Sequence, residues 1–481
     1  MKLDTALYSF ITEAAEGTFS LAPFDTVLQP LLKETLQELA KDQCRKGTVL
    51  IPTLLVWLVL ALTLRRDLSY DKVLNWLVSG LRWVAERLPA QNRLVSEGAI
   101  SHARVKLGVA VFQQLWRKLL PALPALVPDF HEYTSVAFDG STGTMPDTLA
   151  NATVFGKPQA RGGGAAAFPQ VRLMSLLALA ARRLLGLAYA AYTGKGTGER
   201  ALLLTIVQQT VCTGLLFLMD AGLYAFEVLW TLAQREGAFL LKVPAHVHFQ
   251  RTQRLADGSW LARLTGKILD PDAPPTPSGR RRWRPVTLTV RVIRVELSGF
   301  RPFWLMTNVL DPDIPARELA RHYHRRWELE VAYDEIKTHQ CATLRGQSPT
   351  TFRSKLPDLV KQEIYALAIT YTLVRHLMTE AAKAHAQDPT QLSFLDTLQH
   401  LLDAAPLLTA ATPPARVRQY TYLLALLADC ELDRPRRPRL NPRVVKVKMS
   451  KFARKRATHL GQTRDMTADL RILEVAEPVL A

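Results

Sequence analysis

Two short apolar segments that each end in an aspartate constrain the fold of this chain more than any other feature. Thr134–Asp139 reads Thr-Ser-Val-Ala-Phe-Asp, and Leu215–Asp220 reads Leu-Leu-Phe-Leu-Met-Asp. Apolar runs of this length predict buried β-strands, and segments of helical pattern alternate with them. The sequence therefore predicts a mixed α/β layer. A carboxylate at a strand end, next to Gly140 or Gly222, is well placed to meet a ligand.

The segment from Tyr323 to Lys337 contains no Gly or Pro, which favours one uninterrupted helix. It also carries Arg326 and Glu330. At about 100° per residue, the three charged residues fall at about −60°, −20° and −40° from Tyr323 in chain order. Such a strip suits an anionic ligand held by the cations and a metal held by the acid. A solvated face with ordinary ion pairs explains the spacing equally, and Asp334 is a rival acid on nearly the same face.

The net charge is +18, from 61 Lys and Arg against 43 Asp and Glu. A polyanion is the natural partner of such a surface. Residues 434–456 carry eleven of the basic residues and no acid, which leaves +7 for the rest of the chain. Basicity thus indicates a nucleic-acid-binding tail more firmly than a nucleic-acid-binding body. Ribosome-associated and membrane-surface proteins share this pattern.

The four cysteines are far apart, which argues against zinc ligation and a disulfide framework and favours a reducing cytoplasm. The first residues lack the apolar core of a secretory signal. Val49–Leu64 is the most membrane-like run, but it is shorter than the roughly 18–20 residues that span a bilayer. We expect it to form a buried core helix and expect no membrane association.

The spacing Tyr-x2-Arg-x3-Glu-x6-Lys resembles the motif of DDE transposases of bacterial insertion sequences, the IS-four family. Two other segments match the same family in the right order: Val136–Thr142, followed by Pro146 and Asn151, and Leu215–Gly222. The three acidic motifs together are far more specific than any one alone. The resemblance implies a ribonuclease-H-like catalytic core with a β-rich insertion, flanked by helical N- and C-terminal domains.

Five segments follow from the patterns and this resemblance. The N-terminal one would recognise DNA ends, and the β-rich one would interrupt the catalytic core. Asp257-Gly258 signals a hairpin there, and Val286–Val292 alternates with strand period. The expected boundaries are 1–125 for the helical N-terminal domain, 126–245 for the first part of the core, 246–300 for the β-rich insertion, 301–375 for the second part of the core, and 376–481 for the helical C-terminal domain with its basic tail.

The resemblance implies that Asp139, Asp220 and Glu330 are the catalytic acids and the metal ligands. Two divalent ions about 4 Å apart activate an attacking hydroxyl and stabilise the departing oxygen. Hard Mg²⁺ prefers carboxylate oxygens, so two Mg²⁺ ions are expected, and Mn²⁺ can substitute. Asp147 and Asp311 are rival acids that we interpret as turn or cap residues.

Tyr323, Arg326 and Lys337 are expected to bind the phosphates around the scissile bond. Trp304 lies where some relatives place an aromatic residue that stacks on a flipped base; a core tryptophan explains it as well. Further DNA contacts are expected from basic residues, although an exposed charged loop accounts equally for the first four. These residues are Arg280, Arg281, Arg282, Arg284, Lys446, Lys448, Lys451 and Arg454.

The function implied is cut-and-paste transposition: metal-dependent cleavage at terminal inverted repeats, then joining of the 3′ hydroxyls to target DNA. Its partners would be double-stranded DNA and a second copy of the chain in a synaptic complex, on the nucleoid of a bacterial cytoplasm. A catalytically silent, transposase-derived DNA-binding regulator is the alternative. A ribonuclease-H-like nuclease without strand transfer is a third hypothesis, which the Lys337 spacing and the β-rich insertion disfavour.

Overall fold

The fold is described here from a computed structural model. Arg280 and the basic stretch 434–456, with Lys446, Lys448, Lys451 and Arg454, lie outside the described residues. The described residues are 22–45, 48, 50–78, 95–159, 163–270, 272–274, 278, 281–297, 301–343, 346–347, 351–432 and 470–475.

The contacts of the chain divide it into two compact units. The first comprises residues 1–127, 139–206 and 328–432, and the second comprises residues 128–138, 207–327 and 433–481. The expected boundaries of the five segments stay predictions. In the part of the chain that the structure describes, no helix has both the length and the apolarity of a membrane span.

The first unit begins with helices: η1 (Ala22–Phe24), α2 (Asp25–Glu38), α3 (Pro52–Leu64), α4 (Tyr70–Leu77), α6 (Glu97–Leu107) and α7 (Ala110–Ala122). Pro52 at the first position of α3 has the φ that a helix start requires. Residues 54–64 of α3 are all buried, which confirms the prediction of a core helix.

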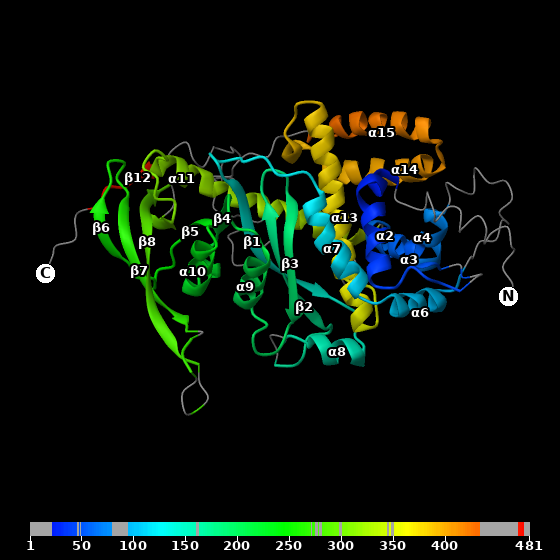
Figure 1. Ribbon diagram of the computed structural model, residues 1–481, viewed down its shortest axis with the longest axis horizontal. Coiled ribbons are helices and arrows are strands. Elements are labelled where there is room, and N and C mark those ends of the chain that lie inside the picture. Colours follow the sequence, from blue (N-terminus) through cyan, green and yellow to red (C-terminus); the bar gives the residue numbers. More distant parts are fainter. Residues whose placement is uncertain are drawn as a thin grey trace, which may run out of the picture. The chain divides into compact units, whose positions relative to one another are not determined.

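Three C-terminal helices pack in the same unit. They are α13 (Pro357–Ala384), α14 (Phe394–Ala410) and α15 (Pro413–Ala428), with the short η5 (Pro389–Gln391) between the first two. Figure 1 shows α13 as the long helix beside α14 and α15. Its sides are buried along most of its length, so α13 is the central helix of this unit.

The strands of the first unit are β2 (Gln170–Ala178) and β3 (Arg183–Ala191), which pair antiparallel, and the short antiparallel pair β10 (Ala342–Thr343) and β11 (Gly346–Gln347). Helix α8 (Leu149–Phe155) precedes β2, and α9 (Glu199–Gln209) follows β3. A hydrophobic cluster joins these elements to α13. It contains Met145, Phe155, Val171, Cys341, Phe352, Val360, Ile364 and Leu367.

The second unit is built on parallel strands. Residues 134–137 of β1 (Thr134–Thr144) pair with β4 (Leu215–Met219), and β4 pairs with β5 (Ala238–Lys242), both parallel. The turn η2 (Ala221–Leu223) and helix α10 (Phe226–Gln234) connect β4 to β5. Antiparallel β9 (Phe303–Thr307) then adds to β5.

A long antiparallel ribbon continues from β9 in the second unit. It consists of β8 (Trp283–Glu296), β7 (Trp260–Leu269) and β6 (Gln250–Arg254), with β12 (Arg471–Ile472) also on β8. Figure 1 shows β7 and β8 as a long pair. Gly258 has a φ of 82°, as the predicted Asp257-Gly258 turn requires. The expected β-rich character of this region is confirmed.

The segment that carries the Tyr/Arg/Glu/Lys spacing is helical but not regular. It comprises α11 (Ala316–Tyr323), the 3₁₀ turn η3 (His324–Trp327), α12 (Glu328–Asp334) and the π-helical turn η4 (Glu335–Gln340). The prediction of one uninterrupted α-helix is therefore wrong, and angles computed at 100° per residue do not carry across these turns. Neither turn contains Gly or Pro, so tertiary contacts must have selected them.

The fold class is confirmed as α/β. In the strand order, β3, β2 and β1 are neighbours, and β1, β4 and β5 are parallel neighbours. This connectivity, with helices before and after it in the chain, is that of a ribonuclease-H-like core with helical flanks.

Candidate functional site

Asp139 lies within β1 rather than at its end. The strand continues to Thr144, because β1 has β2 as a neighbour in the sheet, so the prediction that this strand ends at the aspartate is wrong. The side chain is half-buried, and its Oδ1 accepts a hydrogen bond from the backbone N–H of Gly140 at 2.8 Å. Asp139 thus presents its carboxylate from within a strand of the sheet.

Glu199, at the start of α9, brings a further carboxylate to Gly140, the residue of β1 that follows Asp139. A Cβ at Gly140 would lie 2.7 Å from Glu199 Oε1, so glycine is what allows this approach. Sequence reasoning gave Glu199 no role in the site. The signal that could have found it is an acid opening the helix that follows a core strand.

Tyr333 of α12 connects Asp139 to the helix that carries Glu330. Its hydroxyl donates to the Asp139 carbonyl oxygen at 2.8 Å and lies 2.6 Å from Ser175 Oγ. Burial raises the pKa of Tyr333, with a further contribution from the negative charge of Asp139. Within the first unit, Tyr333 therefore connects the strand of Asp139 to the helix of Glu330. Sequence reasoning missed Tyr333, although it is one helical turn beyond Glu330.

Glu330 and Lys337 are both exposed on this helical segment. The Lys337 ammonium lies 5.3 Å from the centre of the Tyr333 ring, a cation–π contact. Asp334, the rival acid, is also exposed, and its Oδ1 accepts from Thr338 Oγ1 at 2.6 Å. Asp334 thus has a local partner on its own helix, as a helix-surface residue does.

Asp220 belongs to the second unit and follows β4 directly, as predicted. It is exposed, and its Oδ1 accepts from the Ala221 N–H at 2.8 Å at the start of η2. Tyr323 is buried beside it and donates its hydroxyl to the Met219 carbonyl oxygen at 3.1 Å. Burial, with the added charge of Asp220, raises the pKa of Tyr323 to about 12. Tyr323 therefore supports the end of β4 as a protonated phenol.

Arg326 is half-buried in the second unit. Its guanidinium lies 5.1 Å from the centre of the Trp327 ring and 6.0 Å from that of Tyr323. Trp327 itself is 41% exposed, so packing does not account for it fully. The two aromatic rings orient the arginine without neutralising it, since neither carries a charge.

Trp304 of β9 is half-buried between two side chains of its own unit. Arg294 lies 5.3 Å from the centre of its ring, and Phe249 makes an edge-on contact at 5.3 Å. Trp304 is therefore not a fully buried core tryptophan. Its stacking on a base stays a prediction.

The remaining basic residues are only partly described. Arg281, Arg282 and Arg284 are exposed at the start of β8, around Trp283, which is 55% exposed. Elsewhere, Asp147 pairs with Lys157 at 2.7 Å, and Asp311 Oδ1 accepts from the Asp313 N–H at 2.9 Å. Both acids thus have the local partners expected of turn residues.

The chemistry of the predicted acids suits magnesium, since three carboxylates supply hard oxygen donors without His or Cys. Asp139 and Glu330 belong to the first unit and Asp220 to the second. Among the residues that the structure describes, no three Asp, Glu, His or Cys side chains are grouped as ligands of one ion. Convergence of the three acids therefore stays a prediction.

Comparisons with known proteins agree with these motifs. The family described as "Transposase DDE domain" matches residues 131–373, and the family described as "Insertion element 4 transposase N-terminal" matches residues 20–117. The chain is similar to the transposase InsG for insertion sequence element IS4 of Escherichia coli K12, with 28% identity over 408 residues, 83% of this chain and 86% of that protein. A solved piggyBac transposase synaptic complex with hairpin DNA aligns at a TM-score of 0.40 and 8% identity, over 87% of this chain and 86% of the other.

Proposed function

Since the chain belongs to the DDE transposases of the insertion-element-4 family, an enzyme family of DNA cleavage and strand transfer, we propose that Asp139, Asp220 and Glu330 carry its reaction. The substrate is the DNA at the terminal inverted repeats of an insertion sequence. Cleavage there would free the element for joining to target DNA.

The contact that best supports this proposal is the hydrogen bond from Tyr333 to the Asp139 carbonyl. It couples two segments that are far apart in sequence and that carry the first and last acids of the motif. Neither segment needs this contact for its own secondary structure, since the hydroxyl is a side-chain donor. Such a contact supports a catalytic centre, because reacting groups must be held in a fixed mutual geometry.

DDE transposases depend on divalent metal, and we infer that Asp139, Asp220 and Glu330 hold two Mg²⁺ ions, with Mn²⁺ as a substitute. When bound, such ions lower the pKa of a nucleophile and stabilise a leaving oxygen. The protein's own contribution is to supply the carboxylates. Glu199, whose carboxylate lies against Gly140, would add negative charge next to this part of β1.

Lys337 and Arg326 are the residues proposed to bind the phosphates flanking the scissile bond, together with Tyr323. Lys337 is exposed and supplies a point charge, and Arg326 supplies a planar fork with two donors. Trp304 and the exposed arginines of β8 would contact the same DNA. Opposite charges on the acids and these cations let one site bind both metal and phosphate.

The reaction proceeds in two steps, cleavage and strand transfer. Water attacks the phosphodiester at the element end, the bond from phosphorus to the 3′ oxygen breaks, and the element keeps a free 3′ hydroxyl. That hydroxyl then attacks a target phosphodiester, forms the new bond and releases a target 3′ hydroxyl. We infer that two copies of the chain hold both ends in one synaptic complex on the bacterial nucleoid in the cytoplasm.

The test is cleavage of DNA that carries the element's own ends, with Mg²⁺ present. We expect Asp139→Ala, Asp220→Ala and Glu330→Ala each to abolish cleavage while DNA binding persists, because each removes a metal ligand. The loss expected is at least 10³-fold, on the scale of about 4 kcal/mol of transition-state stabilisation. Asp334→Ala is the matched control and should cleave normally.

Cleavage retained by any of the three variants would remove that residue from the site. Loss of cleavage in Asp334→Ala, with Glu330→Ala still active, would make Asp334 the third catalytic acid in place of Glu330. A wild-type chain that binds the ends but never cuts them would instead revive the silent DNA-binding regulator.

A further inference from the structure

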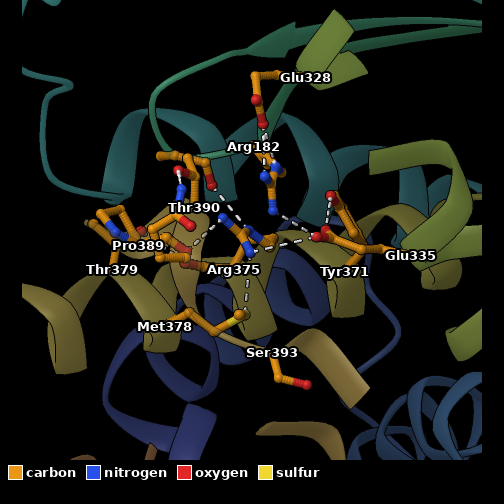
Figure 2. A network of polar contacts seen from close by, with 12 residues as sticks. Arg182, Glu328, Glu335, Tyr371, Arg375, Met378, Thr379, Pro389, Thr390 and Ser393 are labelled. Carbon is orange, nitrogen blue, oxygen red and sulfur yellow. Dashed lines mark hydrogen bonds and ion pairs between the residues drawn. The ribbon is translucent and has the colours of Figure 1, made fainter. Parts of the chain in front are cut away.

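The buried side of the helical segment 328–340 is held by charged residues (Figure 2). Arg182, Glu328, Glu335, Tyr371 and Arg375 form what we call the charge cluster. All five belong to the first unit. The exposed side of the same segment carries Glu330 and Lys337.

Glu335 is the centre of the charge cluster. One oxygen, Oε1, accepts from Arg182 Nη1 at 3.0 Å and lies 3.7 Å from Arg375 Nη1. The other, Oε2, accepts from the Tyr371 hydroxyl at 2.9 Å. Its side chain is only 1% exposed, so this carboxylate depends on the cluster for its partners.

Arg182 links Glu335 to the start of α12. Its Nε and Nη2 donate to Glu328 Oε2 at 2.9 and 2.6 Å. The residue has a φ of 47°, in the left-handed region that side chains with a Cβ adopt only under strain. Burial opposes its charge, but Glu335 and Glu328 outweigh burial and raise the pKa of Arg182.

Arg375 ties the cluster to the surrounding backbone. Its Nε donates to the Ala181 carbonyl oxygen at 2.9 Å, and its Nη2 donates to that of Pro389 at 3.2 Å. The β2–β3 turn and α13 are therefore bound to the same carboxylate. Figure 2 shows Glu335 between Arg182, Tyr371 and Arg375.

Glu335 also begins the π-helical turn. There the N–H of Cys341 donates to the Ile336 carbonyl oxygen, five residues back, at 2.9 Å. Within this turn Glu335 is buried and Lys337 is exposed, as residues two apart on a helix face opposite sides. A π turn is rarely stable by itself and occurs often at functional sites. The charge cluster holds the first residue of this turn, and Gln340 at its last residue donates to Thr370 Oγ1 at 2.7 Å.

We propose that Glu335, with Arg182 and Arg375, positions Glu330 and Lys337 for the reaction. This inference rests on the proposed function. Buried ion pairs contribute little net stability compared with apolar packing of the same volume, so stability alone does not account for two arginines and two glutamates here. Their directional hydrogen bonds do restrain orientation.

The decisive variant is Glu335→Gln, which keeps the shape and removes the charge. The matched control is Glu363→Gln in α13, a buried glutamate that binds Arg104, Ser354 and the Arg353 N–H in the same unit. At a temperature where both variants are folded by circular dichroism, we expect Glu335→Gln to slow end cleavage about a hundredfold, the scale of a 1 Å misplacement. Affinity for the end DNA should fall much less than the cleavage rate, because Lys337 is one of several proposed phosphate contacts.

A second readout separates positioning from general destabilisation. Hydrogen exchange within residues 328–340 should accelerate in Glu335→Gln but not in Glu363→Gln. Glu328→Gln is a variant that keeps the buried core of the cluster, since Glu328 is 27% exposed, and it should show a smaller loss in the same direction.

Cleavage by Glu335→Gln and Glu328→Gln at the rate of Glu363→Gln, with Glu330→Ala inactive, would overturn this inference and leave the proposed function intact. Full cleavage by Glu330→Ala would overturn both. If the Glu335→Gln protein does not fold, the cleavage rate and the hydrogen exchange of Glu328→Gln test the inference instead.

Discussion

At the scale of single residues, the candidate site depends on a few side chains that connect its segments. Gly140 allows the Glu199 carboxylate to approach β1 at the residue after Asp139. Tyr333 serves Asp139 through its hydroxyl and Lys337 through its ring. The Tyr333 side chain therefore contacts both the strand of Asp139 and the segment of Lys337. Deleting its hydroxyl removes the first contact and keeps the second.

Tyr333→Phe tests this arrangement. It removes the donor to the Asp139 carbonyl and keeps the ring under Lys337. We expect a loss of about 2 kcal/mol in the free energy of unfolding, the usual value of two hydrogen bonds, because Ser175 Oγ loses the same hydroxyl as the Asp139 carbonyl does. End cleavage should slow by about tenfold or more, since a misplaced strand costs alignment.

Tyr420→Phe is the matched control, because its hydroxyl donates to Glu380 Oε2 at 2.7 Å on helices far from the motif in sequence. Denaturant unfolding and single-turnover cleavage measure the two effects. Equal cleavage rates for the two variants would remove Tyr333 from the site.

At the scale of elements, the orientation of α11 is set by contacts made before the motif begins. Asp257 accepts from the Ala316 N–H at 2.7 Å and pairs with Arg291, which fixes the start of the helix. Near its end, His322 Nε2 lies 2.5 Å from Ser135 Oγ at the start of β1, and the ring stacks on Phe130. These contacts position Tyr323 against the end of β4.

Stability should fall in acid because of His322. Burial lowers its pKa to about 4, although Asp129 opposes this, and Arg325 and His131 lower it further. Between about pH 6.5 and 4, this histidine is protonated in the unfolded chain but stays neutral in the folded one, so the free energy of unfolding decreases as pH falls. The contribution of neutral His322 to the free energy of unfolding is fully present above about pH 6.5. At most about 3 kcal/mol is lost as the pH falls through 4.

Denaturant unfolding at pH 7 and pH 4.5 checks this expectation. His322→Gln keeps a polar group near Ser135 and does not titrate, so its stability should depend less on pH than that of the wild type. An identical pH dependence in the two proteins would assign acid sensitivity to other groups.

At the scale of the whole molecule, charge is distributed unevenly along the chain. Eleven of the basic residues fall in 434–456 without an acid, whereas the segment 323–337 that carries the proposed phosphate-binding Arg326 and Lys337 also contains four acids. Binding of DNA and cutting of DNA are therefore expected to depend on different parts of the chain.

Replacing Lys446, Lys448, Lys451 and Arg454 by Gln in the full chain tests this separation. If each contacts a phosphate, the slope of log K against log salt should become less steep by about 3 to 4. The cleavage rate of fully bound DNA should stay unchanged. An unchanged slope, measured by fluorescence anisotropy from low to high salt, would show that these residues do not contact the backbone.

Much of this protein could be predicted from local patterns. Apolar runs located β1 and β4, the Asp257-Gly258 pair located a hairpin, and α3 was predicted as a core helix. The spacing of three acids, with Tyr323, Arg326 and Lys337, predicted the family. These features are readable because strand and helix periodicity, turn chemistry and motif spacing are properties of short segments.

Other features depend on partners from distant segments, and no short segment encodes them. β1 extends past Asp139 because β2 lies beside it, and the helix of Glu330 widens into a π turn where Glu335 meets Arg182 and Arg375. Tyr333 binds the Asp139 carbonyl for the same kind of reason. A buried polar group takes whichever partner the packed chain provides, so these choices arise only on folding.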